Sequence, residues 1–266
     1  MNRDSVSWWR NLMESLGILT PHLRSSLQLR VSSRYTVECV DAMGHLKWRS
    51  EFCNLVVNTG LNMLLDNSFG AVPGSVAAYV GLIGAGAGTV AITSGAAAVT
   101  GSSTTFDAGL ATAPKADIII VGAGASGADL IETVNTRSSN TALATLGNAG
   151  TTVSGAAYAT EPIAGDTLAS HINSWAEVTP YSNANRPTWT KNGAASGGAM
   201  SNSSAKASFT INATSRIFGA FMATDNTKGG TSGILYGGGL FITGGSRAVQ
   251  SGDTVNVQVD LSVTAS

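Results

Sequence analysis

Residues 253–264 read Asp-Thr-Val-Asn-Val-Gln-Val-Asp-Leu-Ser-Val-Thr, in which apolar and polar side chains alternate without a break. This period of two is typical of a β-strand with one dry face and one solvated face. From about Gly165 onward the chain has the same character, in segments punctuated by Gly, Ser and Thr. The sequence therefore predicts an all-β protein whose polar side chains serve turns and surfaces, which favours assembly over catalysis.

The composition favours a protein that lies against other protein surfaces. Only 12% of the 266 residues are charged, about half of the ~25% usual for a soluble domain. So few charges leave a weakly polar surface, which suits contact with copies of the same chain or with a partner. A β-protein rich in Gly, Ala, Ser and Thr can also be soluble alone, and that alternative stays open.

The charges are unevenly distributed along the chain. Residues 1–50 carry seven basic and four acidic side chains, residues 51–185 carry two basic and nine acidic ones, and residues 186–266 are again basic. A basic N-terminal part followed by an acidic middle favours docking onto an acidic protein surface or a neighbouring copy. The basic residues form no dense stripe, so nucleic acid is not an expected partner.

The N-terminal arm, residues 1–34, is the expected partner-binding segment. Residues 5–17 have apolar side chains at helical spacing, which predicts a short amphipathic helix that is stable only when docked. Two adjacent tryptophans are its best anchors, although they could equally pack on their own domain. The candidate partner-binding residues are Trp8, Trp9, Arg10, Arg24 and Arg30.

Charged residues interrupt every apolar run near the N-terminus, so the sequence predicts neither a secretory signal nor a membrane span. Synthesis and assembly are therefore expected in a cytoplasm. Cys39 and Cys53 are then expected to be reduced.

The chain divides into a host β-domain and an inserted module. Residues 35–40 and 45–52 flank turn residues 41–44 and predict a hairpin in which Cys39 faces roughly Leu46. A short helix is expected within residues 55–66 and a buried strand at 77–83. Between Gly84 and about Thr160 the composition changes to Gly, Ala, Thr and Ser, with turn signals every eight to twelve residues or so, which is typical of a small sandwich or barrel.

We therefore expect a host β-sandwich built from residues 35–87 and 161–266, with a small β-barrel inserted at 88–160. The strand-like pieces of the insert are residues 89–93, 97–100, 117–121, 129–134, 141–146 and 151–158. The two ends of the insert should lie close together, as they do in most inserted domains.

One segment matches a dinucleotide-binding fingerprint. Asp117–Val121 reads as a strand and is followed by Gly122-Ala123-Gly124-Ala125-Ser126-Gly127, the spacing that lets a pyrophosphate approach a helix N-terminus. The acidic residue expected about 20 positions later is missing, and no alternating βαβ pattern follows. A Gly-rich hairpin loop is the preferred interpretation, and a dinucleotide-binding enzyme is the remote alternative.

The other chemical motifs are absent or weak. The sequence contains neither a phosphate-binding GxxxxGK[ST] loop nor a GxSxG nucleophile elbow. Cys39, His45 and Cys53 match no common zinc spacing. The acidic residues Asp166, Glu177, Asp253 and Asp260 are expected to cap turns or face solvent. We therefore predict no catalytic residue, no cofactor and no metal.

A set of residues spread over the expected host domain forms a distinctive combination: Asp41-Ala42-Met43-Gly44, Phe52-Cys53-Asn54-Leu55, Trp175-Ala176-Glu177-Val178, Arg186-Pro187, Gly219-Ala220-Phe221, Leu235-Tyr236-Gly237 and Arg247-Ala248-Val249. It resembles a widespread group of bacteriophage structural proteins, usually found among head or tail genes. The insert, with Gly88-Thr89-Val90-Ala91-Ile92-Thr93 and Gly155-Ala156-Ala157-Tyr158, is similar to small β-modules of phage fibres and other virion proteins.

The resemblance implies a non-enzymatic virion protein. The leading expectation is a capsid decoration or cement protein that binds the major capsid protein as a trimer or dimer and has no membrane partner. The alternative is a tail or tail-fibre component in attachment. Neither resemblance implies catalytic residues.

Overall fold

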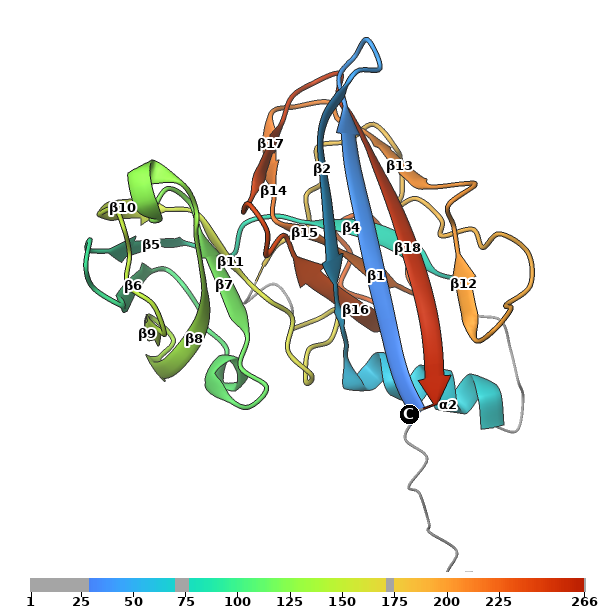
Figure 1. Ribbon diagram of the computed structural model, residues 1–266, viewed down its shortest axis with the longest axis horizontal. Helices are drawn as coiled ribbons and strands as arrows, with labels where there is room; N and C mark the ends of the chain where they lie inside the picture. The colour runs from blue at the N-terminus through green and yellow to red at the C-terminus, as the bar shows by residue number, and fades with distance from the viewer. Residues whose placement is uncertain (1–28, 70–76, 171–174, 266) are drawn as a thin grey trace, which may run out of the picture. The chain divides into compact units, whose positions relative to one another are not determined.

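The computed structural model describes residues 29–69, 77–170 and 175–265 (Figure 1). Strands are the main regular element of the described chain, and its one α-helix is α2 (Asn58–Phe69). The predicted all-β class is therefore confirmed, and so is the short helix expected within residues 55–66. The helix expected at residues 5–17 lies outside the described residues and stays a prediction.

The first sheet is antiparallel and centres on the strand that the alternating sequence predicts. Its order is β12-β18-β1-β2, and β13 pairs with another part of β18. Its strands are β1 (Leu29–Val40), β2 (Leu46–Cys53), β12 (Ala199–Ser201), β13 (Ala207–Thr210) and β18 (Thr254–Ala265).

The alternation in β18 sets which residues enter the core. Val255, Val257 and Val259 have no exposed surface, whereas Val263 is 43% exposed. The core packed against this strand reaches Leu261 but does not include Val263. The predicted dry face is thus confirmed for most of the strand and ends before its last valine, where the core ends.

The hairpin of β1 and β2 forms as predicted, with a different register near its turn. Asp41 accepts hydrogen bonds from the backbone N–H groups of Met43 and His45, each at 2.9 Å. A register shift between Cys39 and Val40 places Cys39 opposite Trp48 rather than Leu46. The expected pairing was wrong by two residues. One comes from the turn, where Val40 rather than Cys39 lies opposite Leu46, and the other from the bulge, whose extra residue cannot be read from the turn sequence.

Asn202 substitutes for a strand between β12 and β13. Its side chain has no exposed surface, donates to the carbonyl of Val257 at 3.2 Å and accepts from the N–H of Val259 at 2.7 Å. The amide thus provides the hydrogen bonds that a neighbouring backbone would otherwise supply along this stretch of β18.

A second antiparallel sheet shares a hydrophobic core with the first. Its order is β3-β16-β15-β4, and α2 packs on β16. The core joins Tyr35 and Val37 of the first sheet to Val80 and Met222 of the second. The strands are β3 (Leu55–Val56), β4 (Tyr79–Ile83), β15 (Gly219–Ala223) and β16 (Leu235–Leu240), with a separate pair formed by β14 (Ser215–Ile217) and β17 (Arg247–Val249). The predicted buried strand at residues 77–83 is confirmed by β4.

The remaining strands form a curled seven-stranded sheet with the order β10-β5-β6-β9-β8-β7-β11. It has its own core, which includes Phe106, Leu110 and Tyr158. Its elements are β5 (Thr89–Ile92), β6 (Ala98–Ser102), β7 (Asp117–Ile120), β8 (Leu130–Ser139), β9 (Ala142–Thr145), β10 (Val153–Ala156) and β11 (Tyr158–Thr160), with the 3₁₀ turns η1 (Ala108–Ala111) and η2 (Ala125–Gly127).

The single strand predicted at residues 151–158 is in fact two strands. β10 and β11 are separated only by Ala157, yet they are the two opposite edges of the seven-stranded sheet. The sheet therefore curls far enough for one continuous stretch of chain to serve both of its edges. A local pattern of apolar residues cannot reveal such a change of partner.

The two ends of the seven-stranded sheet's chain segment lie side by side. The backbone N–H of Gly86, before β5, donates to the carbonyl of Tyr158 in β11 at 2.7 Å. A further core cluster joins Ile119 and Ala159 of this sheet to Trp175 and Phe221 outside it. The expected proximity of the two ends is confirmed.

Candidate functional site

The structure describes one of the five predicted partner-binding residues. Trp8, Trp9, Arg10 and Arg24 lie outside the described residues, and their role stays a prediction. Arg30 lies on β1 and is exposed.

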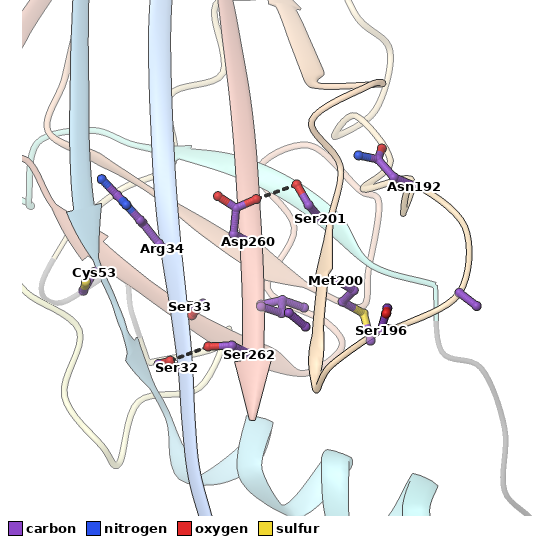
Figure 2. A pocket seen from close by; sticks show the side chains of 13 residues that line it. Ser32, Ser33, Arg34, Cys53, Asn192, Ser196, Met200, Ser201, Asp260 and Ser262 are labelled. Atoms are coloured by element: carbon purple, nitrogen blue, oxygen red, sulfur yellow. Dashed lines mark hydrogen bonds between the residues drawn. The ribbon is translucent and has the colours of Figure 1, made fainter. Parts of the chain in front are cut away.

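A groove with a volume of about 570 Å³ lies beside β1, β18 and β12 (Figure 2). Short polar side chains line it together with an apolar floor. Its polar lining includes Ser32, Asn192, Ser201, Asp260 and Ser262, and its apolar lining includes Met200 and Leu261.

Hydrogen bonds within the groove fix its polar groups. Ser201 Oγ donates to Asp260 Oδ1 at 2.5 Å, and Gln258 Nε2 donates to the same carboxylate at 3.0 Å. Ser32 Oγ and Ser262 Oγ lie 2.8 Å apart. None of the described residues that line this groove is a histidine, so its hydroxyls have no imidazole base beside them. The groove is better suited to holding a polar chain or ligand than to activating a nucleophile.

Sequence reasoning did not find this groove. Its walls come from three separate segments, residues 32–34, 192–201 and 260–262, together with Cys53 of β2. These are brought together only by the order of strands in the sheet. Serine, alanine and asparagine also carry no chemical signal of their own in a chain so rich in them.

The segment that resembles a dinucleotide fingerprint is a hairpin loop. It joins β7 to β8, which pair antiparallel, with Asp117 opposite Thr133 and Ile120 opposite Leu130. Only the three-residue η2 follows the first glycines. The preferred interpretation as a Gly-rich loop is confirmed, because a pyrophosphate site of this type needs a long helix and a parallel strand.

Asp129 gives this loop a structural role. Its Oδ1 accepts from the N–H of Gly122 at 3.1 Å, and its Oδ2 accepts from the N–H and the Oγ of Ser246 at 2.8 and 2.5 Å. Ser246 in turn accepts a hydrogen bond from Arg216 at 2.8 Å. One carboxylate therefore ties the β7–β8 loop to the segment that precedes β17.

Replacing Asp129 by alanine is expected to loosen this connection and to lower the free energy of unfolding by about 1–3 kcal/mol, because buried donors lose their acceptor. Amide hydrogen exchange should speed up at both Gly122 and Ser246. Asp107→Ala is the matched control, since Asp107 caps η1 through Gly109 and should leave exchange at Ser246 unchanged. Equal protection of Ser246 in both variants would show that Asp129 does not hold the two segments together.

Glu177 and Arg186 form a buried ion pair, and the expectation that Glu177 caps a turn or faces solvent was wrong. The Arg186 side chain has no exposed surface, and its Nη2 lies 2.8 Å from Glu177 Oε2. Arg186 also donates to the carbonyls of Asp225 and Gly230 at 2.9 and 2.6 Å and lies over the ring of Phe221. Tyr181 and the N–H of Gly229 donate to the carboxylate. Every partner in this network is internal, so its role is structural.

Two carboxyl groups near the end of β11 have raised pKa values. Burial, with a further contribution from the nearby Asp117, raises the pKa of Glu161 to about 7. Burial also raises the pKa of Asp166 to about 6, although the N–H of Ile163 donates to it at 3.0 Å. Glu161 borders a cavity of about 290 Å³ between residues 53–55 and residues 114–116.

We expect the contribution of Glu161 to the stability of the folded chain to fall as the pH rises from about 4.5 to about 7. The pKa of Glu161 is higher in the folded state than in the unfolded state, so the folded state binds more protons in this window. Its contribution is fully present below the unfolded pKa and is lost as the pH passes the folded pKa. Urea unfolding of the native chain and of Glu161→Gln at several pH values measures this contribution.

The difference in stability between the two proteins should change by about 1–3 kcal/mol across that window. Asp66→Asn, at an exposed site on α2, controls for the loss of one negative charge. Parallel pH profiles of the native chain and Glu161→Gln would contradict the prediction.

Residues 29–69, 77–170 and 175–265 contain no group of three or more His, Cys, Asp or Glu side chains placed to hold a metal ion. The two cysteines differ in exposure, since Cys39 is buried and Cys53 is exposed. Burial, reinforced by Asp253, raises the pKa of Cys39 to about 12. Within the same ranges no helix is long and apolar enough to cross a membrane.

No protein-family model, no curated protein and no solved structure matches this chain.

Proposed function

We propose that this chain is a non-enzymatic structural protein of a bacteriophage virion, and that it decorates the capsid and stabilises the head. The observation that carries the proposal is where the residues of the phage-like combination lie. Trp175, Glu177, Arg186 and Phe221 are distant in sequence but belong to one buried network of aromatic and ionic contacts.

The proposed architecture is a host β-sandwich, residues 35–87 and 161–266, that carries an inserted β-barrel at residues 88–160. All seven strands of the curled sheet lie between Thr89 and Thr160. Their segment leaves and rejoins the rest of the chain at neighbouring points, beside the hydrogen bond from Gly86 to Tyr158. Both features are typical of an insertion.

A decoration protein stabilises a shell by mass action, because it binds the assembled state and not the open one. In this proposal the N-terminal arm, with Trp8 and Trp9, grips the major capsid protein. The β-structure of the described residues, stabilised by internal hydrogen bonds and ion pairs, then spans the joint between capsid subunits.

Quantitative mass spectrometry of separated heads and tails tests the location. Many copies per head, in proportion to capsid subunits, are expected. A small number confined to the tail fraction would favour the tail or fibre alternative, for which the groove of Figure 2 is the available ligand site. Absence from both fractions would refute the virion proposal.

Adding the purified chain to emptied heads tests the role. The melting temperature of the heads should rise, and the double change Trp8→Ala and Trp9→Ala should abolish the rise without changing the folding of the free chain. Unchanged head binding by this variant would contradict the role of the arm.

A further inference from the structure

β2 is the outer strand of the first sheet, and one side of its backbone is unpaired in the described chain (Figure 1). The N–H of Asn54 donates to the carbonyl of Ser33, directly opposite it. Because such pairs alternate along an antiparallel ladder, Phe52 and Ser50 also bond to β1. The N–H and C=O groups of Arg49 and Glu51 therefore point outward, away from β1.

The centre of this strand carries a polar group that has no partner within the described residues. Ser50 is 7% exposed, and its Oγ makes no hydrogen bond there. A buried hydroxyl without a partner costs about 1–3 kcal/mol. The Oγ is covered by atoms of the same chain, so Ser50 can meet a second chain only through its backbone and Cβ.

The side chains on either side of Ser50 are chemically complementary. Arg49 and Glu51 precede and follow it on one face of the strand, with 52% and 33% of their side chains exposed. On the other face Trp48 and Phe52 are both aromatic. A strand with this symmetry can pair antiparallel with an identical strand so that each arginine meets a glutamate and each tryptophan meets a phenylalanine.

We propose that β2 pairs antiparallel with β2 of a second copy of this chain, about a twofold axis at Ser50. The outward backbone groups of Arg49 and Glu51 then bond to those of Glu51 and Arg49 in the second copy, and the two Ser50 residues lie opposite each other. This inference rests on the proposed function, since it names the chain's own copy as a partner within the assembly. The interface is isologous and closes at two subunits.

The charges select this register over its neighbours. Residues whose N–H and C=O groups point away from β1 must pair with residues of the same kind in the second copy. The register can therefore change only in steps of two residues. A shift in one direction places Arg49 opposite Arg49, and a shift in the other places Glu51 opposite Glu51. Directly opposed like charges destabilise a sheet, so the register centred on Ser50 is favoured over both of its neighbours.

Contacts within each chain already hold the charged side chains in place. Glu51 contacts both Arg34 and Arg49, and Arg49 Nη1 lies 3.4 Å from Glu38 Oε1. These contacts limit the entropy that the arginine and glutamate lose on pairing. The same charges discourage pairing with unrelated strands, which is how natural sheets protect an edge.

Joining two eight-residue strands buries less than the ~1,600 Å² of a standard interface. We therefore expect a weak dimer, with a Kd on the order of micromolar, that the high local concentration on a virion surface would favour.

Sedimentation of the full chain over a range of concentrations, combined with cysteine cross-linking, tests the proposal. In a Cys53→Ser background, Ser50→Cys places two thiols opposite each other with Cα atoms about 4.5 Å apart, which permits a disulfide. Arg49→Cys and Glu51→Cys are the matched controls, because in the proposed pairing neither residue lies opposite the same residue of the second copy.

We expect a monomer–dimer equilibrium, an intermolecular disulfide for Ser50→Cys and none for either control alone. A mixture of the Arg49→Cys and Glu51→Cys chains should cross-link between the two. A monomeric mass at every concentration, or self-linkage of Arg49→Cys as efficient as that of Ser50→Cys, would overturn the proposal.

Adding the same samples to emptied heads separates this inference from the function on which it rests. A chain that stabilises heads but stays monomeric and fails to cross-link would refute the β2 pairing alone. A chain that dimerises as described but is absent from virions would refute the virion role alone.

Discussion

Replacement of Arg186 by methionine is expected to lower the free energy of unfolding by about 3–5 kcal/mol, one of the two largest effects of a single change in this chain. The substitution leaves the Glu177 carboxylate buried without its counter-charge. It also removes the donors to the carbonyls of Asp225 and Gly230, which lie 2.9 and 2.6 Å from the guanidinium. Methionine fills the space but supplies none of these hydrogen bonds.

Urea unfolding followed by tryptophan fluorescence measures this effect. The double change Arg186→Met and Glu177→Leu should recover part of the loss, because it removes the uncompensated charge as well. Arg34→Met serves as the control, since Arg34 pairs with Glu51 at the surface and should cost less than about 1 kcal/mol. Equal losses for Arg186→Met and Arg34→Met would show that burial does not set the strength of the Glu177 pair.

Replacement of Gly60 by alanine is the second large effect, and two principles predict opposite signs for it. Helix propensity alone favours alanine over glycine by about 1 kcal/mol. Packing opposes it, because a Cβ at this position would lie 2.2 Å from the carbonyl oxygen of Tyr236 in β16. That atom belongs to the backbone of a strand paired on both sides and cannot move aside cheaply.

Overpacking typically costs about 1–3 kcal/mol and more where backbone must shift, so packing decides the sign. Gly60→Ala should therefore destabilise the chain by about 2 kcal/mol or more. The control is Asn62→Ala, at an exposed position of the same helix, which should be neutral or slightly stabilising. A higher melting temperature for Gly60→Ala would mean that α2 is free to move away from β16.

Local patterns predict local structure well in this chain. The alternation in residues 253–264 identifies β18, and turn residues 41–44 identify the hairpin of β1 and β2. Each of these features depends on backbone preferences and on which face of a strand is dry, and both properties are written in neighbouring residues.

Features that depend on distant contacts were missed. The partnership of Glu177 with Arg186 spans nine residues of irregular chain, and nothing in either neighbourhood marks the two side chains as buried. The groove beside β18 combines three separate segments. The division of residues 151–158 between β10 and β11 depends on how far the sheet curls. In each case the decisive information is the order of strands, which no single segment contains.

The closeness of Gly86 and Tyr158 has an evolutionary consequence. Because the segment leaves and rejoins the chain at adjoining points, recombination could remove it and reseal the remaining chain with a short linker. Removal would, however, strip Ile119 and Ala159 from the cluster that contains Trp175 and Phe221 and expose large aromatic surfaces to water. The connectivity permits exchange of the seven-stranded segment between genes. The shared cluster, however, means that the segment and the rest of the chain must be inherited together, or that their contacting residues must change together.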